Sequence, residues 1–90
     1  MNVNVCLICG YSKLQEPPRD ATGAPSWEIC PCCGGEAGYH DCQPSAVIRN
    51  RKKWIENGAQ WFDNHLKPAD WSLKDQLCSI GIDLDKTKDT

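Results

Sequence analysis

Long apolar runs are missing from this 90-residue sequence, and no stretch approaches the length needed to cross a bilayer. Residues 1–5 contain no basic segment followed by an apolar core, so we expect no secretory signal peptide. A carboxylate pair or a Ser/His arrangement of the kind used in catalysis is also not evident, so we expect no enzymatic activity. Together these absences favour a cytoplasmic protein that neither spans a membrane nor performs catalysis.

Positive charge is scarce in residues 1–44, which contain Lys13 and Arg19 against five carboxylates. Because nucleic-acid binding depends on clustered lysine and arginine, this acidic first half argues against a nucleic-acid partner. The one basic cluster comes later and consists of Arg49, Arg51, Lys52 and Lys53. This cluster either binds phosphate or an acidic partner, or forms the solvated face of a helix, and we favour the solvated face.

Cysteine, by contrast, is abundant, with seven in the chain. Four of them form two hooks, each with two cysteines separated by two residues and followed by glycine: Cys6, Cys9, Cys30 and Cys33. A two-residue gap lets two sulfurs face one point, each about 2.3 Å from a zinc ion. Because so short a chain buries only a thin core, we expect one metal ion on these four thiolates to staple it. Zinc (Zn2+) is our first choice, and iron (Fe) is the alternative, since tetrahedral thiolate sites accept both.

The other three cysteines fall outside this pattern. Cys32 is expected to be a free, mostly buried thiol, with a reactive thiol near the metal as the alternative. One further alternative is a second metal site built from His40 and Cys42 with Cys32, His65 or Cys78. We favour a surface histidine and two half-buried thiols instead.

Short strands are expected on either side of the first hook and before the second. Residues 3–5 and 11–14 form the predicted hairpin, and residues 26–29 form a further strand. Trp27 and Ile29 are two apart, so they share one face of that strand and are expected to cover the metal site. The intervening stretch is rich in proline and is predicted to be a loop.

Two helices are predicted from Pro44 onward. The first covers residues 46–57, with Ser45 as its N-cap and Gly58 as a left-handed C-terminal residue. Its apolar stripe consists of Val47, Ile48, Trp54 and Ile55. The second helix starts at Ser72 with a capping-box-like sequence and ends at Gly81. Its buried face is expected to consist of Leu73, Leu77 and Ile80.

The aromatic side chains of the second half have two readings. The simpler one makes them the core that joins the helices to the metal module: Trp54, Trp61, Phe62 and Trp71. However, four tryptophans are many for 90 residues, and tryptophan is a preferred anchor of protein interfaces. An exposed tryptophan on a thin core would therefore indicate a binding module.

Three stretches resemble the bacterial cysteine-rich CPCC family: Cys6-Leu-Ile-Cys9-Gly-Tyr, Glu16-Pro-Pro, and Ser26-Trp-Glu-Ile-Cys30-Pro-Cys-Cys33-Gly. The later stretches Arg51-Lys-Lys-Trp-Ile-Glu-Asn-Gly-Ala-Gln-Trp61 and Pro68-Ala-Asp-Trp71 are similar to uncharacterised bacterial proteins. This resemblance implies a zinc-ribbon or rubredoxin-like module of unsettled function, with metal ligands at Cys6, Cys9, Cys30 and Cys33. Members are similar to small proteins found beside toxin and immunity systems.

The hooks also resemble rubredoxin, whose Cys-x-x-Cys-Gly-Tyr and Trp-x-Cys-Pro-x-Cys-Gly stretches surround one iron. Here Trp27 lies one place further from Cys30, and more than fifty residues follow the second hook. This second resemblance implies a one-electron carrier as an alternative function.

The predicted architecture is a small metal-stapled α+β fold, with a zinc-ribbon or rubredoxin-like β-hairpin module followed by two helices. Residues 1–43 form the metal-binding module, 44–82 the helical extension packed on it, and 83–90 a flexible tail. The predicted function is a small zinc-binding module that binds another protein, and an immunity- or antitoxin-type partner protein is one concrete version of it. A rubredoxin-like electron carrier is the first alternative, and a nucleic-acid-binding zinc ribbon is the second.

Overall fold

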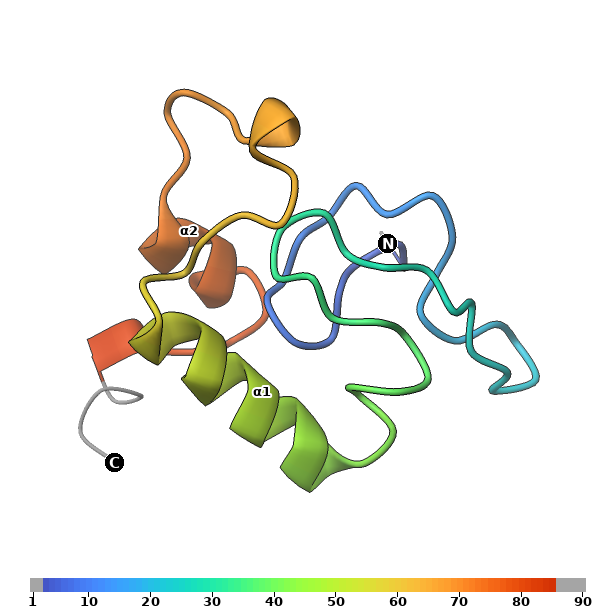
Figure 1. The fold of residues 1–90 in the computed structure, drawn as a ribbon. Coiled ribbons are helices and arrows are strands. Elements are labelled where there is room, and N and C mark those ends of the chain that lie inside the picture. Colours follow the sequence, from blue (N-terminus) through green and yellow to red (C-terminus); the bar gives the residue numbers. More distant parts are fainter. Residues whose placement is uncertain (1–2, 86–90) are drawn as a thin grey trace.

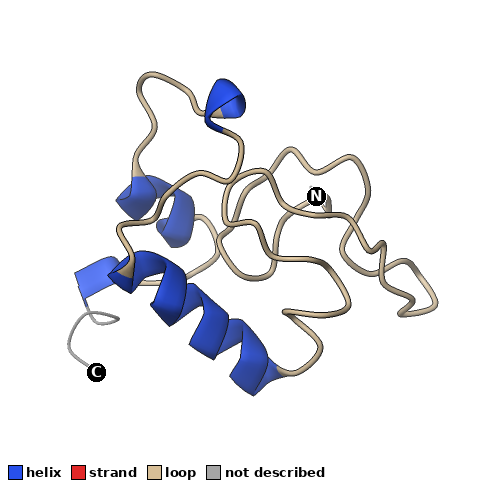
Figure 2. Cartoon of the chain, viewed as in Figure 1, coloured by secondary structure: helices blue, strands red, loops and turns tan. Residues whose placement is uncertain are grey.

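The computed structural model describes residues 3–85, in which long loops join the helices α1 and α2, labelled in Figure 1, and a short 3-10 helix, η1 (Figures 1 and 2). Helix α1 spans Pro44–Glu56, the 3-10 helix η1 spans Asn64–Leu66, and α2 spans Leu73–Cys78. No helix in the described part of the chain is long and apolar enough to cross a membrane. Of the predicted tail, residues 86–90 lie outside the described chain.

The predicted strands are wrong, because residues 3–85 contain two isolated β-bridges and no regular strand. Residues 4–6 and 11–14 do lie side by side, but single bonds join them where a ladder was expected. Cys6 N–H donates to Tyr11 O at 2.8 Å, and Leu14 N–H donates to Asn4 O at 3.2 Å. The pairing shifts by one residue between these two bonds, so they do not belong to one continuous ladder. A zinc-ribbon hairpin is therefore not confirmed.

Helix α1 begins two residues earlier than predicted. Pro44 occupies the first turn and Gln43 is the N-cap, with no side-chain cap bond, so Ser45 is not the cap. Proline suits this place because its fixed φ is helical and its missing N–H would have no helical partner anyway. At the other end, Gly58 has a φ of +91°, which confirms the predicted left-handed residue after the helix.

The apolar stripe of α1 is confirmed except at one residue. Trp54 is buried in the core, and Val47 and Ile55 are half-buried against it. Ile48, at the edge of the stripe, is 60% exposed, so its assignment to the buried face was wrong.

Helix α2 starts as predicted, because the Ser72 side chain accepts a hydrogen bond from Asp75 N–H at 3.2 Å. The cap satisfies one of the free amides of the first turn. Leu77 is fully buried, and Leu73 is half-buried against the core. This short helix is therefore held by the packing of one face and by its cap.

Three tryptophans form the centre of the core, as the simpler reading predicted. The ring of Trp61 meets the rings of Tyr11 and Trp71 edge-on at 5.6 and 5.5 Å, and Trp54 lies 6.3 Å from Trp71. Such edge contacts add to the stabilisation from apolar burial. Phe62 does not belong to this core, because 67% of its surface is exposed.

Trp27 and Ile29 do not cover the metal site as predicted, since they are 59% and 48% exposed. The cause lies in the backbone, because Trp27 has a φ of +61°, in the left-handed region, where an extended strand would have a negative value. Its ring instead lies against the backbone of Gly38. A Cβ at Gly38 would come within 2.7 Å of that ring, so only glycine fits there without a shift.

The left-handed backbone at Trp27 predicts a difference between two truncated variants. Trp27→Ala and Trp27→Gly both remove the exposed ring, but only glycine adopts a φ of +61° without strain. We therefore expect Trp27→Gly to be more stable than Trp27→Ala by about 1 kcal/mol. Chemical denaturation of both metal-loaded variants measures this, and equal midpoints would show that the backbone here is unstrained.

Candidate metal centre

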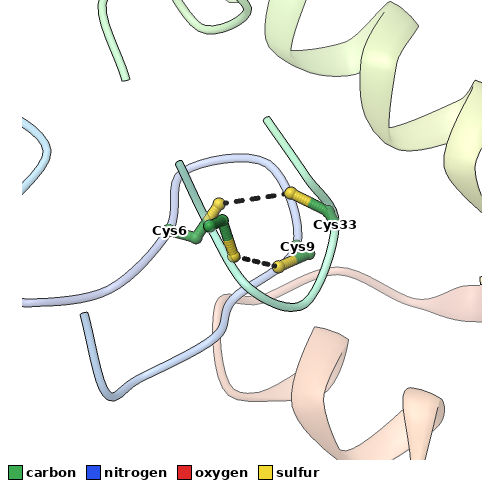
Figure 3. Close-up of side chains that lie close together, drawn as sticks. Cys6, Cys9 and Cys33 are labelled. Atoms are coloured by element: carbon green, nitrogen blue, oxygen red, sulfur yellow. Dashed lines mark hydrogen bonds between the residues drawn. The ribbon is translucent and has the colours of Figure 1, made fainter. Parts of the chain in front are cut away.

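The two hooks bring four sulfurs together, and the dashed lines of Figure 3 mark hydrogen bonds within two of the sulfur pairs. The Sγ atoms of Cys6, Cys9, Cys30 and Cys33 all lie within 4.8 Å of one another. Cys6 Sγ is 3.7 Å from Cys33 Sγ, and Cys9 Sγ is 3.6 Å from Cys30 Sγ. A tetrahedron with zinc–sulfur bonds of about 2.3 Å has edges of about 3.8 Å, so both pairs have the spacing that one ion requires.

The cluster is closed on most sides. Cys6, Cys9 and Cys30 are buried, while Cys33 is half-buried. All four are free thiols rather than disulfides. Four sulfur ligands in such surroundings complete a tetrahedral shell, and they leave no coordination position for a substrate.

Both hooks close with the same backbone turn. Gly10 N–H donates to Cys6 O at 3.0 Å, and Gly34 N–H donates to Cys30 O at 2.9 Å. Both glycines have positive φ, +88° and +76°, which other residues adopt only with strain. At Gly10 there is also no room, because a Cβ would lie 2.8 Å from the carbonyl oxygen of Gln76. The glycines after the hooks are therefore needed for the turn, as the sequence indicated.

The thiols in the cluster shift one another's acidity. The pKa of Cys6 is lowered by hydrogen bonds from the side chains of Cys30, Cys33 and Cys9. The pKa of Cys9 is raised, mainly by its bond with Cys30, and the pKa of Cys33 is raised by Cys30 and Cys6. The pKa values of neighbouring sulfurs thus shift in opposite directions, down at Cys6 and up at Cys9 and Cys33. Binding of a divalent ion would release protons from the thiols, because the metal ligands are thiolates.

Both helices bind the backbone of the first hook. Arg51 of α1 donates from Nε to Ile8 O at 2.7 Å and from Nη2 to Leu7 O at 2.9 Å. Gln76 of α2 donates from Nε2 to Cys9 O at 3.0 Å. Three successive carbonyls of the hook thus accept hydrogen bonds from the helical half. The sequence did not predict this contact, because Arg51 was assigned to a solvated helix face. Partners more than 40 positions apart leave no local pattern that would reveal them.

The position of Arg51 predicts a loss of metal affinity when its guanidinium is removed. Arg51→Met keeps an unbranched stem but leaves Leu7 O and Ile8 O without their donor. Because such outer contacts orient the ligands, we expect metal affinity to fall by about 10–100-fold. Competition with a chromophoric chelator measures this. Arg49→Met, an exposed arginine on the same helix, is the control, and equal affinities for the two variants would exclude this role.

Cys32 is fully buried between two hook cysteines, as predicted. Its thiol accepts a hydrogen bond from Gln76 Nε2 at 3.4 Å, and hydrogen bonding with Cys9 lowers its pKa. Within residues 3–85, the group of four sulfurs that could hold one ion does not include Cys32, although its thiol lies beside Cys9.

The alternative second metal site does not assemble in the described residues. His40 is half-buried, and its Nδ1 accepts a hydrogen bond from Glu36 N–H at 2.9 Å. Cys42 and Cys78 are both exposed, not half-buried as predicted.

Two curated relatives match part of the chain. It is 39% identical over 69 residues to the uncharacterized protein YozI of Bacillus subtilis (strain 168), covering 59% of this chain and 57% of YozI. It is 37% identical over 68 residues to the uncharacterized protein YoaQ of the same organism, covering 59% of this chain and 58% of YoaQ. The chain therefore spans less than two thirds of the length of these relatives.

Neither a family profile nor a solved structure matches the chain. The resemblance to the CPCC family therefore stays a prediction. The class of site is defined by its own geometry, since four clustered cysteines are suited to binding a metal ion.

Proposed function

We propose that this protein is a zinc-binding module whose metal stabilises a surface for binding another protein. The single observation that supports it most is the closed cluster of four sulfurs with tetrahedral spacing. A closed shell of this kind is structural, whereas a catalytic zinc site keeps an open position. The metal then replaces hydrophobic mass in a chain with a small core.

The interaction surface is proposed on different residues from those expected at first. The tryptophans of the helical half are largely occupied in the core, so they are poor interface anchors. Two exposed aromatics lie on the metal module, where Trp27 and Tyr39 are 59% and 67% exposed. Tryptophan and tyrosine are enriched among the residues that contribute most to protein interfaces. A protein of a toxin and immunity system is one concrete partner, as the family resemblance implies.

Electron transfer by iron is the second candidate, and the observation in its favour is the partial exposure of Cys33. A ligand sulfur near the surface offers a short path for an electron, and four thiolates bind iron as well as zinc. Nucleic-acid binding is less favoured, because Arg51 of the basic cluster already bonds to hook carbonyls.

Affinity purification from the native host, with metal analysis of the same sample, tests the proposal. We expect colourless protein with zinc at one ion per chain, together with a co-purifying protein. Zinc removal should release that protein, because the metal supports the surface. A red sample with iron and reversible redox behaviour would instead establish the electron carrier.

A further inference from the structure

Three exposed apolar residues of the metal module lie on two neighbouring loops, residues 25–29 and 36–40. We call the exposed side chains of Trp27, Ile29 and Tyr39 the aromatic face. Ile29 and Glu36 form an isolated antiparallel bridge, and Ala37 N–H donates to Glu28 O at 3.0 Å, so the loops are joined directly. The Trp27 ring lies against Gly38, so Trp27 lies beside the residue that precedes Tyr39 in the chain.

The aromatic face is held in place before any partner arrives. The Asp41 carboxylate accepts hydrogen bonds from Gly38 N–H at 2.7 Å and from Arg19 Nη2 at 2.9 Å. The Tyr39 ring lies edge-on to His40, with 4.7 Å between the ring centroids. A surface already ordered in this way loses little conformational entropy on binding.

Charge around the aromatic face is negative. Glu28 and Glu36 belong to the two loops that carry it. Arg19, which forms a bridge with Pro25 of the first loop, also forms an ion pair with Asp41 at 2.9 Å, so its charge is balanced. A divalent ion on four thiolates would contribute about two more negative charges to this module. A cationic partner is therefore favoured over an acidic one.

From this combination we infer that the aromatic face binds an extended segment of a partner protein that is rich in arginine and lysine. Guanidinium and ammonium groups are attracted to the faces of tryptophan and tyrosine rings, and arginine is the commoner partner. The surrounding carboxylates add attraction of the same sign and would speed association. This inference rests on the proposed function and names the chemistry of its partner.

The test uses zinc-loaded full chain and two short synthetic peptides, one of alternating arginine and glycine and one of alternating glutamate and glycine. NMR titration follows the indole N–H signals of the four tryptophans. We expect the arginine peptide to shift the Trp27 signal and leave that of buried Trp61 in place. Added salt should weaken this binding, because exposed charges are screened. The glutamate peptide should not bind.

Variants localise the binding. Trp27→Gly and Tyr39→Ala should each lower the affinity for the arginine peptide by at least about tenfold, as expected for an interface anchor. Trp27→Gly is used because glycine accepts the positive φ and keeps the loop folded. Phe62→Ala is the matched control, since Phe62 is as exposed as Tyr39 but lies outside the aromatic face. Its affinity should stay within about twofold of the parent.

Four outcomes would overturn the inference: no binding of the arginine peptide, equal binding of the glutamate peptide, loss of binding in Phe62→Ala alone, or self-association abolished by Trp27→Gly. The last would identify a second copy as the occupant. Metal content is measured on the same samples. If the protein holds one zinc ion per chain but does not bind the peptide, only this inference is contradicted. If it holds no zinc, the proposed function is contradicted.

Discussion

Replacing Cys9 by serine is expected to abolish metal binding and unfold the N-terminal half of the chain. Cys9 is fully buried, and its sulfur lies 3.6 Å from that of Cys30, so serine here removes one of the four clustered sulfurs. The binding energy of structural zinc, about 10–16 kcal/mol, is folding energy in such proteins. Loss of a ligand should therefore exceed the about 10–100-fold effect of losing an outer contact. Metal content and far-UV circular dichroism measure both losses.

Cys42→Ser and Cys78→Ser are the matched controls for this variant. Both remove an exposed thiol outside the sulfur cluster, so metal content and fold should be those of the parent. A folded, metal-loaded Cys9→Ser variant would mean that the four sulfurs are not the ligands.

Removing the Trp61 side chain is expected to have the largest effect away from the sulfurs. Trp61 is buried and meets both Tyr11 and Trp71 edge-on, so Trp61→Ala leaves a cavity at the centre of the core. Such truncations lower the free energy of unfolding by about 3–5 kcal/mol, which is a large part of the stability of a small domain. Denaturant unfolding of the zinc-loaded protein measures the change.

Trp61→Phe separates the packing of the ring from its polar atom. The indole nitrogen of Trp61 is buried without a hydrogen-bond partner among residues 3–85. Trp61→Phe therefore breaks no hydrogen bond, and we expect it to lower the free energy of unfolding by less than about 1.5 kcal/mol. Trp54→Phe would lose the bond from Trp54 Nε1 to Gln60 O, at 2.9 Å, and should cost more than Trp61→Phe. The reverse order would show that the indole nitrogen of Trp61 has a partner in solution.

The sulfur cluster could be predicted because its information is local. Each hook sets two sulfurs by a two-residue gap, and the two hooks then meet at one point. The cap at Ser72 is equally local and was predicted from four residues. Pro44 at the start of α1 carried a usable signal that was missed, since proline favours the first helical position.

The strands could not be predicted correctly, because alternating apolar residues do not show where a hook will turn the backbone. At Trp27 the period-two pattern favoured an extended strand, but the positive φ there turns both it and Ile29 toward solvent. The bonds of Arg51 and Gln76 to the hook also lay beyond prediction, since they join residues 43 to 67 positions apart. Such contacts depend on how the helices pack, which no local pattern contains.

X-ray absorption spectroscopy at the zinc edge, on protein purified without added metal, measures the ligand shell itself. Our account predicts four sulfur scatterers at about 2.3 Å and no nitrogen or oxygen in the first shell. Fewer sulfurs, or a shell completed by nitrogen or oxygen, would contradict a centre made of the two hooks.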